Sequence, residues 1–80
     1  MLESILTGEA PSALFRRIIE ADASISNIRL GEIVRDEFGG LSGLAQQIIW
    51  HWKGPGRGQG LSDENLDASL RELFVEAGYL

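Results

Sequence analysis

Apolar residues recur every three or four positions along most of the chain, which is the period of an α-helix. Long amphipathic stretches cover residues 11–23, 27–38, 42–53 and 62–77, and no segment alternates long enough to predict a strand. The pattern therefore predicts a single all-α domain over residues 1–80. We expect a small bundle of four main helices plus a short N-terminal helix.

The short N-terminal helix is predicted by Leu2, Ile5 and Leu6, which have helical spacing and are followed by Gly8 as a stop signal. Residues suited to helix ends mark the other boundaries: Pro11 in a first turn, Ser26 or Asn27, Ser42 and Ser62 as N-caps, and Gly39–Gly40 and Gly78 as C-terminal glycines. Tyr79 and Leu80 are expected to fold back onto the last helical turn.

The apolar stripes also predict the core. A chain of this length buries roughly 60% of its unfolded surface, so each large apolar side chain carries much of the stability. The predicted core consists of Leu14, Phe15, Ile18, Leu30, Ile33, Val34, Phe38, Leu44, Ile48, Ile49, Trp52, Leu66, Leu70, Leu73 and Phe74.

One glycine-rich loop, residues 54–60, separates the last two helices. Four glycines and a proline in seven residues predict a mobile connector. A rival interpretation is an anion site, because its backbone amides lie beside Lys53 and Arg57. The spacing lacks the final Lys-Ser/Thr of a phosphate loop, however, and the loop follows a helix rather than a strand.

Composition limits the chemistry. The chain has no cysteine and one histidine, which excludes disulfides, thiolate zinc sites and a cysteine nucleophile. We find no catalytic motif and expect no enzyme, no cofactor and no metal. The start of the chain does not resemble a signal peptide, and no apolar run is long enough to cross a membrane, so we expect a cytoplasmic protein.

The formal net charge of −5 is concentrated in the last helix. Residues 61–80 hold five acidic side chains against Arg71 alone. This balance disfavours general binding to nucleic-acid phosphates. It predicts either an ordinary solvated helix face or a surface for a basic partner, at which Glu72 and Glu76 are the candidate contacts.

Three residues depart from the pattern of their helices. Trp50 lies on the opposite side of its helix from Leu41, so either the 1–7 helix or the Pro55 loop covers it, or it anchors a partner. His51 lies at the edge of the core stripe, where a bond to a backbone group is expected. Glu37 falls inside the apolar stripe of its helix but near the end, which favours a solvated acid.

We therefore predict a small non-enzymatic module that binds another protein. Its candidate contacts are Trp50, Glu72, Glu76, Lys53 and Arg57. The alternative is a helix-turn-helix DNA-binding protein that uses helices 27–38 and 42–53, although the second helix has no basic residue before Lys53. Self-association into a homo-oligomer stays open.

Overall fold

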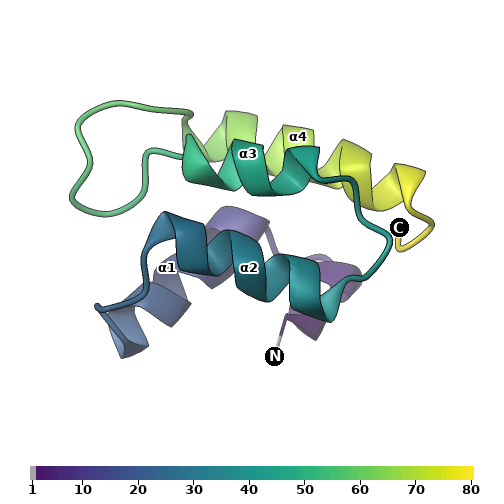
Figure 1. Cartoon of the computed structure of the whole chain (residues 1–80), viewed down its shortest axis with the longest axis horizontal. Coiled ribbons are helices and arrows are strands. Elements are labelled where there is room, and N and C mark those ends of the chain that lie inside the picture. The colour runs from purple at the N-terminus through teal and green to yellow at the C-terminus, as the bar shows by residue number, and fades with distance from the viewer. Residues whose placement is uncertain (1) are drawn as a thin grey trace.

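The computed structural model describes residues 2–80 and confirms the predicted all-α class (Figure 1). Its elements are a 3-10 helix at Glu3–Thr7 and four α-helices, α1 at Pro11–Ala21, α2 at Asn27–Glu37, α3 at Leu44–Trp50 and α4 at Asp63–Glu76. The predicted short N-terminal helix is therefore a 3-10 helix, and Gly8 ends it in the left-handed conformation.

The α2 and α3 helices form a hairpin in which α3 runs back alongside α2 (Figure 1). The α1 and α4 helices contact each other, α3 also contacts α4, and the 3-10 helix contacts α1. Gly31 permits the close approach of α2 to α3. A Cβ atom there would lie 3.2 Å from Trp50 Nε1 and 3.5 Å from the Cα atom of Gln46.

Most predicted helix ends are confirmed. Ser26 Oγ accepts from the Arg29 amide and Ser62 Oγ accepts from the Asn65 amide, both at 3.2 Å. After Gly78, the Tyr79 amide donates to the Phe74 carbonyl at 2.9 Å, so the chain folds back as expected. The exceptions are α1, which ends at Ala21 rather than at residue 23, and both ends of α3.

Ser42 does not begin α3, because the helix starts at Leu44. The Ser42 hydroxyl instead accepts from the Leu44 amide at 3.2 Å within the preceding turn. The helix ends at Trp50 rather than at residue 53, so it has only about two turns.

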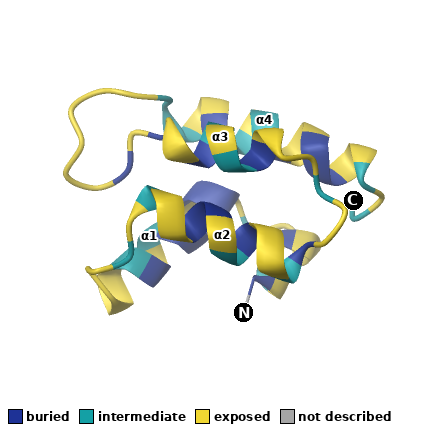
Figure 2. Ribbon diagram, in the orientation of Figure 1, coloured by how far each residue is buried: buried dark blue, intermediate teal, exposed yellow. Residues whose placement is uncertain are grey.

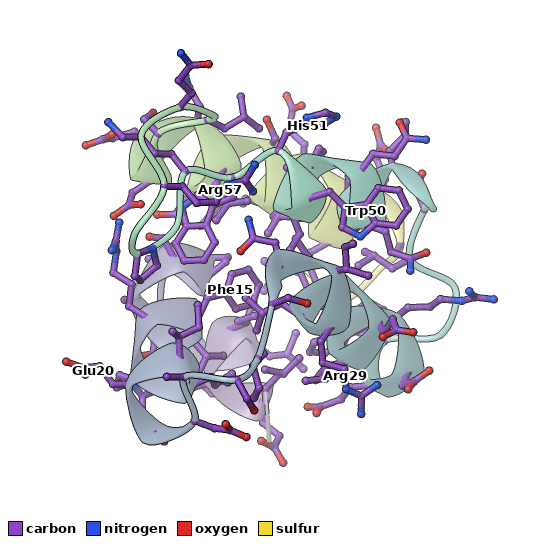
Figure 3. All side chains as sticks on the ribbon, turned by 60° about the vertical axis from the view of Figure 1, so that its left-hand side comes forward. Phe15, Glu20, Arg29, Trp50, His51 and Arg57 are labelled. Carbon is purple, nitrogen blue, oxygen red and sulfur yellow. The ribbon has the colours of Figure 1, made fainter. Side chains whose placement is uncertain are left out.

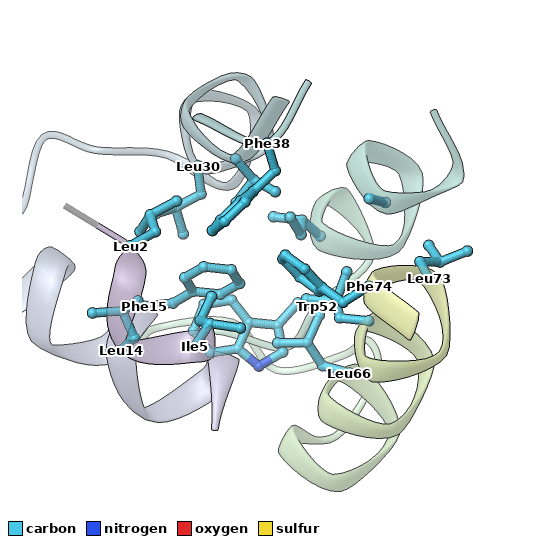
Figure 4. Close-up of a cluster of buried hydrophobic side chains, with 14 of the residues drawn as sticks. Leu2, Ile5, Leu14, Phe15, Leu30, Phe38, Trp52, Leu66, Leu73 and Phe74 are labelled. Carbon is cyan, nitrogen blue, oxygen red and sulfur yellow. The ribbon is translucent and has the colours of Figure 1, made fainter. Parts of the chain in front are cut away.

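The core lies between the helices and largely matches the prediction (Figures 2 and 4). Ile33 and Ile48 are only partly buried and pack against the core. The prediction that Leu44 belongs to the core is wrong, because Leu44 is exposed. Leu2, Ile5 and Ala45 are additional core residues. The predicted residues found buried are Leu14, Phe15, Ile18, Leu30, Val34, Phe38, Ile49, Trp52, Leu66, Leu70, Leu73 and Phe74.

Leu44 is 55% exposed because the buried line of this segment runs through Ala45, Ile49 and Trp52. These residues are spaced i, i+4 and i+7, and Leu44 lies one residue, about 100°, away from that line. In so short a helix, periodicity alone allows either the line through Leu44 or the line through Ala45 to face the core. Contact with α2 and α4 selects the one that buries Trp52.

The start of α1 is capped by a side chain from another helix. Ser12 is buried in the first turn of α1, and its amide and hydroxyl both donate to the Asp67 carboxylate, at 2.8 and 2.7 Å. Asp67 belongs to α4, so this pair joins the two helices. It replaces the local N-cap that Ala10 lacks.

Replacing Asp67 with alanine is expected to lower the free energy of unfolding by about 1–2 kcal/mol, because it leaves the Ser12 amide without its acceptor. Urea denaturation at neutral pH measures the change. Glu72→Ala removes an exposed acid from the same helix and should shift stability by less than about 0.5 kcal/mol. Equal effects of the two variants would contradict the interhelical cap.

Candidate functional site

A groove of about 510 Å³ lies where the end of α1, the start of α2, the end of α3 and the glycine-rich loop meet (Figure 3). Its walls are mainly apolar. They include Ile19, Ile25, Ile28, Trp50, Pro55 and Arg57. We refer to it as the Trp50 groove.

Two large apolar side chains of the Trp50 groove are exposed. Ile28 is 61% exposed and Trp50 is 41% exposed. Trp50 rests against α2 at Gly31, while Pro55 of the loop lines the same groove. The loop and α2 thus cover Trp50 only in part. Of the two covers considered, the N-terminal helix does not supply it, because that helix contacts α1 and lines another cleft with Phe74 and Leu80.

Arg57 reaches back from the loop to the end of α3. Its Nη1 group donates to the Trp50 carbonyl at 2.8 Å and to the Trp52 carbonyl at 3.2 Å. Asn27 Nδ2 also donates to the Trp52 carbonyl, at 2.8 Å. The guanidinium group therefore satisfies carbonyls that the helix end leaves without partners, and its positive charge suits the negative end of the helix.

The base of the loop is closed by backbone bonds. The Leu61 amide donates to the His51 carbonyl at 2.7 Å, and the Lys53 amide donates to the Leu61 carbonyl at 2.8 Å. Gly60 has a φ of +135°, and a Cβ atom there would lie 2.4 Å from the His51 carbonyl oxygen. The segment thus connects α3 to α4 with a paired base and with Arg57 bonded at the end of α3, and its mobility stays a prediction.

Below the loop, Asp63 joins α4 to α1 and to the core. Its Oδ1 atom accepts from Trp52 Nε1 at 3.0 Å and from Arg16 Nη2 at 2.8 Å, and Arg16 Nε donates to Oδ2 at 3.1 Å. The Arg16 guanidinium also lies over the Trp52 ring, 5.4 Å from its centroid. Hydrogen bonds from Arg16, and then from Trp52, lower the pKa of Asp63.

The structure unites only part of the predicted site. Trp50 and Arg57 line one groove, whereas Glu72 and Glu76 are exposed on α4 outside it. Lys53 is exposed beside the loop. Ile28 is the most exposed apolar groove residue that sequence reasoning missed. Its signal was the one that singled out Trp50, an apolar side chain away from the stripe of its own helix.

Two other expectations need correction. His51 is exposed at the end of α3, not at the edge of the core. Glu37 is half-buried, and its Oε2 atom accepts from the Leu2 amide at 2.7 Å. It is therefore a tether for the N-terminal segment rather than a solvated acid.

The 2–80 region contains no helix that is long and apolar enough to cross a membrane. Over the same residues, no three His, Asp or Glu side chains gather where they could hold a metal ion. Comparisons with models of protein families, with curated proteins and with solved structures found no match to this chain.

Proposed function

We propose that this chain is a small non-enzymatic module that binds another protein, and that the Trp50 groove receives apolar side chains of the partner. The observation that supports this most directly is the joint exposure of Trp50 and Ile28 along one groove. Tryptophan is enriched among the residues that contribute most to protein interfaces, and a grouped apolar surface on a soluble domain commonly marks such a site.

The setting of Trp50 favours binding over a purely structural role. Its ring is held against α2 at Gly31, and its carbonyl is bonded to Arg57, so the side chain is positioned before a partner arrives. A preorganised aromatic side chain loses little conformational entropy on binding. The carrier of core stability in this segment is instead Trp52, which is fully buried.

Trp50→Ala is expected to lower the free energy of unfolding by about 1–2 kcal/mol, less than truncation of the fully buried Trp52, since Trp50 is 41% exposed. It should weaken partner binding by about 2 kcal/mol, roughly 30-fold. The probe is a short peptide, selected from a displayed random library for binding to the full chain. Calorimetry gives its Kd, and melting curves give stability.

Val75→Ala is the matched control, because Val75 is an exposed apolar residue on α4 outside the groove. It should leave the Kd unchanged. The double variant Glu72→Lys with Glu76→Lys tests the acidic face of α4. If this variant loses peptide binding while Trp50→Ala keeps it, the binding site lies on α4 and not in the groove. Tight binding of an oligonucleotide instead of peptides would favour the DNA-binding alternative.

A further inference from the structure

We infer that the partner segment carries a carboxylate that binds Arg57 next to the apolar side chain that contacts Trp50. This inference rests on the proposed function and specifies the chemistry of the partner at the same groove. It makes Arg57 the residue that determines specificity, and the exposed apolar wall the source of most of the affinity.

The first argument is the unused hydrogen-bonding capacity of Arg57. Its Nη1 group donates to the carbonyls of Trp50 and Trp52, whereas its Nε and Nη2 groups donate to no protein acceptor within residues 2–80. Arg57 is exposed and lines the groove. A guanidinium group with adjacent Nε and Nη2 donors matches the two oxygens of a carboxylate.

The second argument is charge complementarity. Arg57 is the one charged side chain among the residues that line the groove, in a molecule whose net charge is −5. A basic partner segment would find no acidic side chain in the groove. A neutral segment would not bind the free N–H donors of Arg57, which would stay hydrogen-bonded to water. The net negative charge of the molecule would repel a polyanion such as a nucleic acid far more strongly than one carboxylate on an apolar segment.

The third argument is that Arg57 is held in place before binding. Its two bonds hold the guanidinium group at the carbonyls of Trp50 and Trp52, in the groove that Trp50 also lines. Binding a carboxylate therefore requires little further ordering of this long side chain. An apolar side chain on Trp50 and a carboxylate on Arg57 would then contact the protein through one short segment.

The experiment starts from peptides selected on the full chain, as above, and compares each acidic peptide with its matched amide form, Glu to Gln or Asp to Asn. We expect selection of peptides with an acidic residue near an aromatic or aliphatic one. The native protein should prefer the acidic form by about tenfold or more. Higher salt should reduce this preference, because the charges are exposed.

Arg57→Gln removes the charge together with the adjacent Nε and Nη2 donors, because the glutamine side chain is neutral and shorter. In this variant the acidic and amide peptides should bind within about twofold of each other, with the affinity for the amide form nearly unchanged. Arg57→Lys keeps the charge without the paired donors and should retain part of the preference. A melting curve of each variant verifies folding, and the peptide comparison on the native protein needs no variant.

Selected peptides without acidic residues, or a preference that persists in Arg57→Gln, would overturn this inference and leave the proposed function standing, provided that binding still depends on Trp50. Absence of any Trp50-dependent peptide would overturn both. Tighter binding of an oligothymidylate than of any peptide, lost in Arg57→Gln, would likewise reject the carboxylate partner and point to a phosphate instead.

Discussion

Replacing Trp52 with alanine is expected to leave most molecules unfolded at 25 °C. The Trp52 side chain is fully buried, its ring packs edge-on against Phe15 at a centroid distance of 5.7 Å, and its Nε1 group donates to Asp63. Truncating a buried tryptophan costs about 3–5 kcal/mol. A domain this small has a stability of about that size, so the loss removes most of it.

Far-ultraviolet circular dichroism with thermal or urea denaturation measures this effect. Trp52→Phe is the matched control, since it keeps an aromatic ring beside Phe15 but loses the bond to Asp63. It should remain folded with a reduced melting temperature. Leu44→Ala truncates a side chain that the sequence alone assigned to the core but that is exposed, so it should cost little. A folded Trp52→Ala protein with unchanged melting would contradict the assigned core.

The parts of the fold that the sequence predicts correctly are those set by short-range chemistry. Ser26 and Ser62 cap the helices that follow them, because an N-cap needs only a hydroxyl three residues before an amide. Gly8 and Gly78 end helices because they adopt a positive φ. Apolar spacing also places Trp52 in the core. None of these inferences requires knowledge of where another helix lies.

Besides the alignment and bounds of α3, the sequence missed the roles of polar side chains whose partners are distant in the chain. Asp63 binds Arg16, 47 residues away, Asp67 binds Ser12, 55 residues away, and Glu37 binds Leu2, 35 residues away. Periodicity identifies the face on which an acid lies but not the helix end or guanidinium group that packs against it. From the sequence, Asp63 is one of five acids in residues 61–80, whereas in the fold it joins α4 to α1 and to Trp52.

The sequence also identifies residues of the candidate site but does not predict how they are arranged. Trp50 stood out because an aromatic residue opposite the core stripe requires either cover or a partner. That Arg57 lies beside it depends on the path of the loop, which the Gly60 turn and the pairing of Leu61 with His51 and Lys53 determine. Local sequence rules do not specify such a path. These rules identify Trp50 and Arg57 as candidates, and packing of the folded chain places both in one groove.

Substitution of Asp63 is expected to give the second large effect and to make stability depend on pH. Asp63→Ala leaves the buried Trp52 Nε1 group and Arg16 without their acceptor, which should cost about 1–3 kcal/mol at pH 7. Asp63→Asn keeps an oxygen for Trp52 but loses the charge that pairs with Arg16. It should cost about 1 kcal/mol, because Asp63 and Arg16 are both partly exposed.

The direction of the pH effect follows from the lowered pKa of Asp63 in the folded protein, caused first by Arg16 and then by Trp52. A carboxyl group with a depressed folded pKa stabilises the fold above its unfolded pKa, and this contribution is lost as pH falls through the folded pKa. The native protein and Asp63→Asn should therefore differ at pH 7 and converge below about pH 4. Other acids with lowered pKa values, such as Glu9 and Asp22, are present in both proteins and cancel in the difference. Urea denaturation of the pair across this range measures the difference, and a gap that stays constant down to about pH 3 would show that the Asp63 charge does not stabilise the fold.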